Sequence, residues 1–208
     1  MSALYLIAEG QTDILILERL LAPEVVSNSE LVAAGGSYGA QSLATTLLTL
    51  RRRPLALVVD ADTTHETTIQ ERVDLLRFLL RRAAGNIPYE VFVAVPEIEI
   101  VLLQDRALFE RLMQRPLSDL EWHLARLSPK ETISTIAGPS VGVDYLLSQL
   151  TEKELAVLRQ HELIKGINDF FTTHLSWNQY PMAEHSRAQA LAVAETSAYY
   201  QFDEETEQ

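Results

Sequence analysis

Four mainly apolar runs divide the first half of the chain, at residues 4–8, 31–34, 55–59 and 89–95. Each run has the length of a strand, and those at 4–8 and 55–59 are long and apolar at every position, which is typical of parallel strands that are covered on both faces. Apolar residues at helical spacing follow each run. This alternation predicts a parallel sheet with right-handed crossovers and with helices on its faces.

The second half of the chain has a different pattern, because no strand-like run follows residue 105. Short segments with helical spacing are separated there by prolines and glycines, and they cover residues 107–113, 118–127, 130–136, 143–150, 152–164, 167–174 and 188–198. The predicted fold class is therefore α/β. We expect a parallel sheet of about four strands flanked by helices over residues 1–105, an α-helical extension packed on it over 106–200, and an acidic, disordered tail over 201–208.

Composition narrows the partners and the cellular location. The 208 residues include 17 lysines and arginines against 29 acidic residues, and 17 − 29 gives a net charge of −12. Such a charge repels polyanions, so any binding of nucleic acid must depend on a local basic patch, a bridging metal or a partner protein. The chain has no cysteine, and neither a signal peptide nor a membrane span is apparent, so we expect a cytoplasmic protein with no membrane contact.

Acidic residues follow two of the predicted strands directly. Glu9 comes after the run at 4–8, and Asp60 and Asp62 come after the run at 55–59. In a doubly wound sheet the first and third strands are usually neighbours, and ligands bind outside the carboxyl ends of the strands. Carboxylates this close need a cation between them or a shared proton. The sequence therefore predicts a divalent metal site at this edge of the sheet.

Three short motifs in this order resemble the TOPRIM domain, which occurs in topoisomerases, primases, recombination proteins and nucleases of the OLD (overcoming lysogenization defect) family. The motifs are EGQTD at residues 9–13, GGSYG at 35–39 and DAD at 60–62. The resemblance covers residues 3–105, about half of the chain, and is greatest to the stand-alone and OLD-like branch. It implies that Glu9, Asp60 and Asp62 are the catalytic acids that bind Mg²⁺ or Mn²⁺.

The same branch suggests further site residues. Asp13 and the segment Pro96-Glu97-Ile98-Glu99 would supply ligands for a second metal, and Lys130 or Lys165 would match a catalytic lysine beyond the sheet. Because residues two apart on a helix point in different directions, only one of Glu97 and Glu99 is expected to reach the site unless the backbone there is extended. The alternative interpretation is that Asp13, Glu97 and Glu99 are acids that favour a helix N-terminus.

The activity implied by the resemblance is metal-dependent hydrolysis of phosphodiester bonds in DNA or RNA. OLD-like relatives would also imply a role in bacterial defence against phage together with an ATPase. This ATPase would be a separate protein, because the chain has no Gly-x-x-x-x-Gly-Lys-Ser/Thr motif. The expected partners are thus nucleic acid, a separate ATPase and, as an open alternative, a second copy of the chain.

Two other functions compete with the nuclease interpretation. A non-catalytic TOPRIM-like regulatory or binding protein would agree with the acidic charge. A haloacid dehalogenase-like phosphatase would use the DADTT segment at residues 60–64, with Asp60 as nucleophile and Asp62 as acid/base, although no Gly-Asp-x-x-x-Asp pair follows.

One dense basic cluster occurs, Arg51-Arg52-Arg53. It either contacts a nucleic acid backbone or compensates the dipole of the helix that precedes it.

Overall fold

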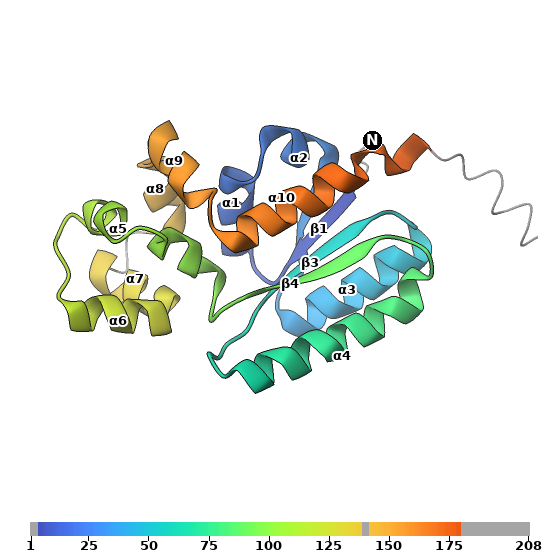
Figure 1. Cartoon of the computed structure of the whole chain (residues 1–208), viewed down its shortest axis with the longest axis horizontal. Helices are drawn as coiled ribbons and strands as arrows, with labels where there is room; N and C mark the ends of the chain where they lie inside the picture. Colours follow the sequence, from blue (N-terminus) through green and yellow to red (C-terminus); the bar gives the residue numbers. More distant parts are fainter. Residues whose placement is uncertain (1–3, 139–141, 180–208) are drawn as a thin grey trace, which may run out of the picture. The chain divides into compact units, whose positions relative to one another are not determined.

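A sheet of four parallel strands forms the centre of the fold (Figure 1), as predicted for an α/β protein. The computed structural model describes residues 4–138 and 142–179. The strands are β1 (Leu4–Ala8), β2 (Ser29–Ala33), β3 (Leu55–Asp60) and β4 (Tyr89–Ala94), in the order β2-β1-β3-β4. The first and third strands are adjacent, with Ile7 opposite Leu57. This pairing places the ends of β1 and β3 side by side.

Two hydrophobic cores cover the two faces of the sheet, which explains why β1 and β3 lack polar alternation. The helices of the first half are α1 (Gln11–Leu20), α2 (Pro23–Asn28), α3 (Ser37–Leu50) and α4 (Glu66–Ala84). One core contains Ile7 and Leu57 and is covered by α3 and α4, whereas the other contains Leu6 and Val58 and is covered by α1 and α10 (Figure 1). Alternate residues of each strand therefore enter different cores.

The second half is helical, in agreement with the predicted α-helical extension. Its elements are the 3₁₀-helix η1 (Ile98–Leu103), α5 (Arg106–Leu112), α6 (Asp119–Leu127), α7 (Pro129–Ala137), α8 (Val143–Ser148), α9 (Glu152–Leu158), α10 (Glu162–His174) and the 3₁₀-helix η2 (Leu175–Gln179). The described residues up to Leu175 form one compact unit. The helix expected at 188–198 and the tail expected at 201–208 lie outside the described residues.

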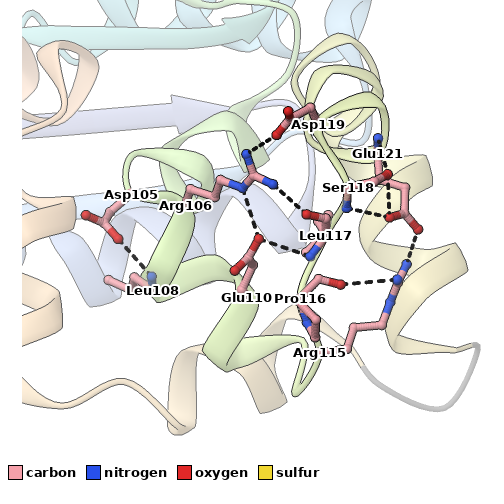
Figure 2. Close-up of polar contacts among 10 residues, drawn as sticks. All are labelled: Asp105, Arg106, Leu108, Glu110, Arg115, Pro116, Leu117, Ser118, Asp119 and Glu121. Carbon is pink, nitrogen blue, oxygen red and sulfur yellow. Dashed lines mark hydrogen bonds and ion pairs between the residues drawn. The ribbon is translucent and has the colours of Figure 1, made fainter.

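A polar network fastens α5 to α6 (Figure 2). The Arg106 guanidinium donates to Glu110 Oε1 at 2.9 Å, to Asp119 Oδ1 at 2.7 Å and to the Leu117 carbonyl. At the start of α6, the Ser118 hydroxyl and the Glu121 carboxylate accept from each other's backbone N–H groups, which satisfies two donors that the helix leaves open. Both α5 and α6 pack against η1, so this network supports the segment that follows β4.

Two predicted helix boundaries are wrong. The helix expected over 152–164 ends at Leu158, and the next begins at Glu162 and continues through Gly166. Gly166 lies between the two expected helices, 152–164 and 167–174, and a Cβ atom there would lie 3.1 Å from Cε1 of Phe92 on β4. The glycine thus marks close packing of α10 on the sheet. Helix α2 was not predicted at all.

No helix in the described ranges has the length and apolar character needed to cross a membrane.

Candidate metal centre

Glu9 and Asp60 meet at the carboxyl edge of the sheet. Glu9 follows the last residue of β1, and Asp60 is the last residue of the adjacent strand β3. The backbone N–H of Asp60 donates to Glu9 Oε1 at 3.2 Å. The structure therefore brings these two predicted residues together, because β1 and β3 are neighbours.

Asp13 lies on the first turn of α1, near Glu9 and Asp60. Its side chain accepts the Gly10 N–H at 2.8 Å, and the residue is buried. Its negative charge raises the pKa of both Glu9 and Asp60, so the three carboxylates are electrostatic neighbours. Asp13 thus caps the helix and also belongs to the acidic cluster, so the two interpretations of this residue are compatible.

Glu99, and not Glu97, is among the charges that raise the pKa of Asp60. Glu97 is the N-cap of η1 in extended backbone, and its Oε2 accepts the Lys130 N–H at 3.0 Å. Glu99 is only 1% exposed, and its Oε2 has no hydrogen-bond partner within the described parts of the chain. Burial first, and then the charges of Glu97 and Asp13, raise its pKa against the effect of its own backbone N–H and of Lys130. An unpartnered, buried carboxylate oxygen is costly without a proton or a cation.

Asp60 has the most strongly displaced pKa at this site, about 7. Burial is the largest cause, and the negative charges of Asp13, Glu99 and Glu9 act in the same direction. The Ile98 N–H, which donates to Asp60 Oδ1 at 2.9 Å, opposes the shift. Burial likewise raises the pKa of Glu9, against the effect of Arg72 and of the Asp60 N–H. Four carboxylates thus share a poorly hydrated region that lacks enough positive charge.

Asp62 lies at the outer rim of this region. It has a positive φ of 54°, and its N–H donates to the Pro96 carbonyl at 2.9 Å. Its side chain is 68% exposed and pairs with Arg72, whose Nη1 is 3.3 Å from Asp62 Oδ2. Asp62 therefore lies on the exposed side of the cluster, where Arg72 contacts both it and Glu9.

Arg72 on α4 is the site residue that the sequence did not reveal. Its Nη2 lies 3.1 Å from Glu9 Oε1 and 2.8 Å from Ser37 Oγ, and its Nη1 also donates to the Ala61 carbonyl at 3.3 Å. One signal could have found it. The buried residues of α4 are Leu76, Leu80 and Ala84, and Arg72 occupies the preceding position of this four-residue repeat, where a charge is out of place.

The two predicted lysines differ in position. Lys130 lies in the first turn of α7, and its charge lowers the pKa of Glu99. Lys165 is an exposed residue of α10, and in the part of the chain that the structure describes it forms no hydrogen bond or ion pair with the acidic cluster.

The arginine cluster Arg51-Arg52-Arg53 lies at the opposite edge of the sheet, where β3 begins. These residues follow α3 and precede the start of β3, and the Arg53 guanidinium lies 5.9 Å from the ring centre of Tyr5 near the start of β1. At roughly 3.3 Å per residue, β3 separates this edge from Asp60 by about 17 Å. The cluster therefore cannot contact the same phosphate as the carboxylates.

The side-chain oxygens of the acidic cluster are of the chemical type that a hard divalent cation prefers. Glu9, Asp13, Asp60 and Glu99 offer only carboxylate oxygens, which Mg²⁺ and Mn²⁺ prefer, and Glu99 Oε2 has no other partner within the described residues. As the side chains stand, no group of three or more acidic or histidine residues within 4–138 and 142–179 is arranged to hold a metal ion. Metal binding would thus require side chains of this cluster to rearrange.

A scan against protein-family models and a search of curated proteins both find no match to this chain. The function must therefore be inferred from the geometry of the site and from the motif resemblance.

Proposed function

We propose that this protein is a metal-dependent nuclease that hydrolyses phosphodiester bonds in DNA or RNA at a TOPRIM-like site. The main support is one observation: the carboxylates of Glu9, Asp13, Asp60 and Glu99 gather at one edge of a parallel sheet, and an oxygen of the buried Glu99 has no partner among the described residues. A cluster of this kind is expected where a divalent cation supplies the missing positive charge.

Each residue then has a defined task. Glu9 and Asp60 would hold Mg²⁺ or Mn²⁺, with Asp62 at the rim, and Asp13 and Glu99 would hold a second ion. Bound ions of this kind lower the pKa of an attacking water and stabilise the oxygens of an in-line displacement. Lys130, whose charge lowers the pKa of Glu99, would bind a phosphate oxygen of the substrate. Hydrolysis by water requires no nucleophilic side chain.

The proposed biological context is bacterial defence against phage, with a separate ATPase as partner. This part of the proposal depends on the resemblance to OLD-like proteins and on the absence of a phosphate-binding Gly-x-x-x-x-Gly-Lys-Ser/Thr motif from the sequence. A protein with a net charge of −12 also benefits from a partner that brings the nucleic acid to it. A second copy of the chain is the alternative partner.

A non-catalytic regulatory protein is the second candidate. It is favoured by the ion pairs of Arg72 with Glu9 and Asp62, because carboxylates that are already neutralised by arginine need no metal.

The test is an activity assay on isolated wild-type protein with Mg²⁺ or Mn²⁺ and plasmid, single-stranded DNA, tRNA or an aryl phosphate. Glu9→Gln and Asp60→Asn remove charge with little change of shape, and each should lower Mn²⁺-dependent cleavage by about a hundredfold or more, since the loss of even an indirect metal-site contact costs roughly 10–100-fold. Glu18→Gln on the exposed side of α1 is the control that should keep full activity. Release of phosphate from the aryl ester alone would favour the phosphatase, and absence of any activity would favour the regulator.

A further inference from the structure

A side chain of the protein itself already places a positive charge among the predicted metal ligands. The Arg72 guanidinium lies 3.1 Å from Glu9 Oε1 through Nη2 and 3.3 Å from Asp62 Oδ2 through Nη1. The two acids belong to different strand ends, so the guanidinium bridges the turns after β1 and β3. A divalent ion between the same two turns would make the same connection with oxygen ligands.

Neutral acceptors hold Arg72 in this position. Nη2 donates to Ser37 Oγ at 2.8 Å and Nη1 donates to the Ala61 carbonyl at 3.3 Å. The arginine side chain is only 23% exposed, and it extends from the helix row that includes the buried Leu76. It therefore differs from a mobile surface arginine, whose ion pair would be worth little.

Oε1 of Glu9 has little capacity for an additional cation while this arrangement persists. Its Oε1 accepts from both Arg72 Nη2 and the Asp60 N–H. A metal ion bound to Glu9 would lie within a few ångströms of a guanidinium of like charge, in a region that burial makes poorly screened. Occupation by the metal and the present contacts of Arg72 thus oppose each other.

We infer that Arg72 is an intramolecular competitor of the divalent cation: it neutralises Glu9 and Asp62 in the metal-free protein and thereby weakens metal binding at this site. The inference rests on the proposed function in that it takes Glu9 to be a metal ligand. It also assigns Ser37 a role as a positioning residue, because its hydroxyl holds the guanidinium against Glu9.

The test measures Mn²⁺ affinity directly, from the electron paramagnetic resonance signal of free Mn²⁺ during titration at low ionic strength. Arg72→Gln should bind Mn²⁺ about tenfold or more tightly than wild type, a change that corresponds to roughly 1.4 kcal/mol. Arg77→Gln is the matched control. Arg77 lies on the same helix, and its Nη2 pairs with Glu90 at 2.8 Å, so its loss changes the net charge equally and should leave the affinity unchanged.

Ser37→Ala keeps the net charge and should raise the affinity severalfold by releasing one anchor of the arginine. It also provides a test if Arg72→Gln does not fold. In thermal melts, Mn²⁺ should raise the Tm of Arg72→Gln more than that of wild type, because the ion replaces the lost positive charge. Glu9→Gln, introduced into wild type or into Arg72→Gln, should abolish the rise of Tm that Mn²⁺ causes.

The outcomes separate the inference from the proposed function. If wild type binds Mn²⁺ in a manner that needs Glu9, but neither Arg72→Gln nor Ser37→Ala binds more tightly, the competitor role is rejected and the metal site stands. If none of these proteins binds Mn²⁺, both the metal site and the competitor role are rejected. If Arg77→Gln binds Mn²⁺ as tightly as Arg72→Gln, the gain in affinity comes from the change in net charge alone, and the inference is also rejected.

Discussion

At the residue scale, Asp60 shows how burial and neighbouring charge act together. Both favour its protonated form and raise its pKa to about 7, although Asp60 retains the Ile98 N–H as a donor to Oδ1. An ordinary surface aspartate would be ionised at neutral pH. In the metal-free protein, ionisation of Asp60 therefore works against folding, and the same ionisation is what prepares the group to bind a cation.

We predict that Asp60→Asn stabilises the metal-free protein at pH 8. The folded-state pKa of Asp60 is raised from 3.8 to about 7, so the native state binds the extra proton between these values. The stability contributed by this proton is present below pH 4 and is lost as the pH rises through 7. The variant, whose Oδ1 can still accept from Ile98, should exceed wild type by on the order of 2–4 kcal/mol at pH 8 and by little at pH 4.

Urea denaturation with EDTA at a series of pH values measures this difference. Comparison with wild type cancels the contributions of other groups, such as Glu121, whose low pKa of about 2 makes the protein lose stability in acid. Glu18→Gln serves as the exposed control. A variant that is less stable than wild type at pH 8 would show that the Asp60 carboxylate is adequately compensated in the metal-free state.

The sequence predicted the placement of two candidate site residues correctly. It predicted that Glu9 and Asp60 would lie at neighbouring strand ends, because that follows from strand order alone. It could not decide between Glu97 and Glu99, since the choice depends on an extended N-cap followed by a 3₁₀ turn. It missed Arg72, because the contacts of this residue with Glu9 and Ser37 join segments that are 63 and 35 positions apart in the chain.

At the element scale, the loop from β2 into α3 depends on a glycine within the helix itself. A Cβ atom on Gly39 would lie 2.3 Å from the Ala34 carbonyl oxygen. Gly36, with a φ of 117°, precedes Ser37 at the start of α3, and the Gly36 N–H donates to the Glu9 carbonyl at 2.8 Å. The GGSYG segment therefore packs α3 closely against the strand ends and positions Ser37 for Arg72.

We predict that Gly39→Ala destabilises the protein by about 2 kcal/mol or more, although alanine is the better helix former, because the new methyl group must displace backbone. Chemical denaturation measures the loss of stability. Ser42→Ala in the same helix is the control and should have a small effect, since Ser42 is exposed. An unchanged stability in Gly39→Ala would mean that the loop from β2 to α3 can shift freely.

The strands and their alternation with helices were predictable, whereas several helix boundaries were not. Apolar runs are sufficient to identify a buried strand, but Gly166 has the same sequence signature whether it ends a helix or packs against Phe92. Likewise, α2 has six residues and only Val25 is buried, so its apolar periodicity is too short to detect.

At the scale of the whole molecule, charge separates the two edges of the sheet. The acidic cluster lies at the carboxyl edge, whereas Arg51, Arg52 and Arg53 lie at the opposite edge beside the start of β3. With a net charge of −12, long-range attraction cannot bring a nucleic acid to the carboxylates. A bound cation would offset part of this negative charge and provide a direct contact to a phosphate oxygen.

We therefore predict that binding of nucleic acid requires a divalent cation. In fluorescence anisotropy with labelled DNA or RNA, EDTA should abolish binding. Ca²⁺, a hard ion with the same preference for oxygen ligands, should restore it.

The affinity should fall only slightly with salt. The slope of log K against log salt concentration should be near −1 to −2, because few basic side chains would contact phosphates. Neutralising Arg51, Arg52 and Arg53 together should not matter, whereas Lys130→Gln should weaken binding, because the charge of Lys130 acts on Glu99 in the acidic cluster and the three arginines lie at the opposite end of β3. Binding that persists in EDTA and disappears in the triple variant would instead place the nucleic acid at the basic edge, and the carboxylates would then need another substrate.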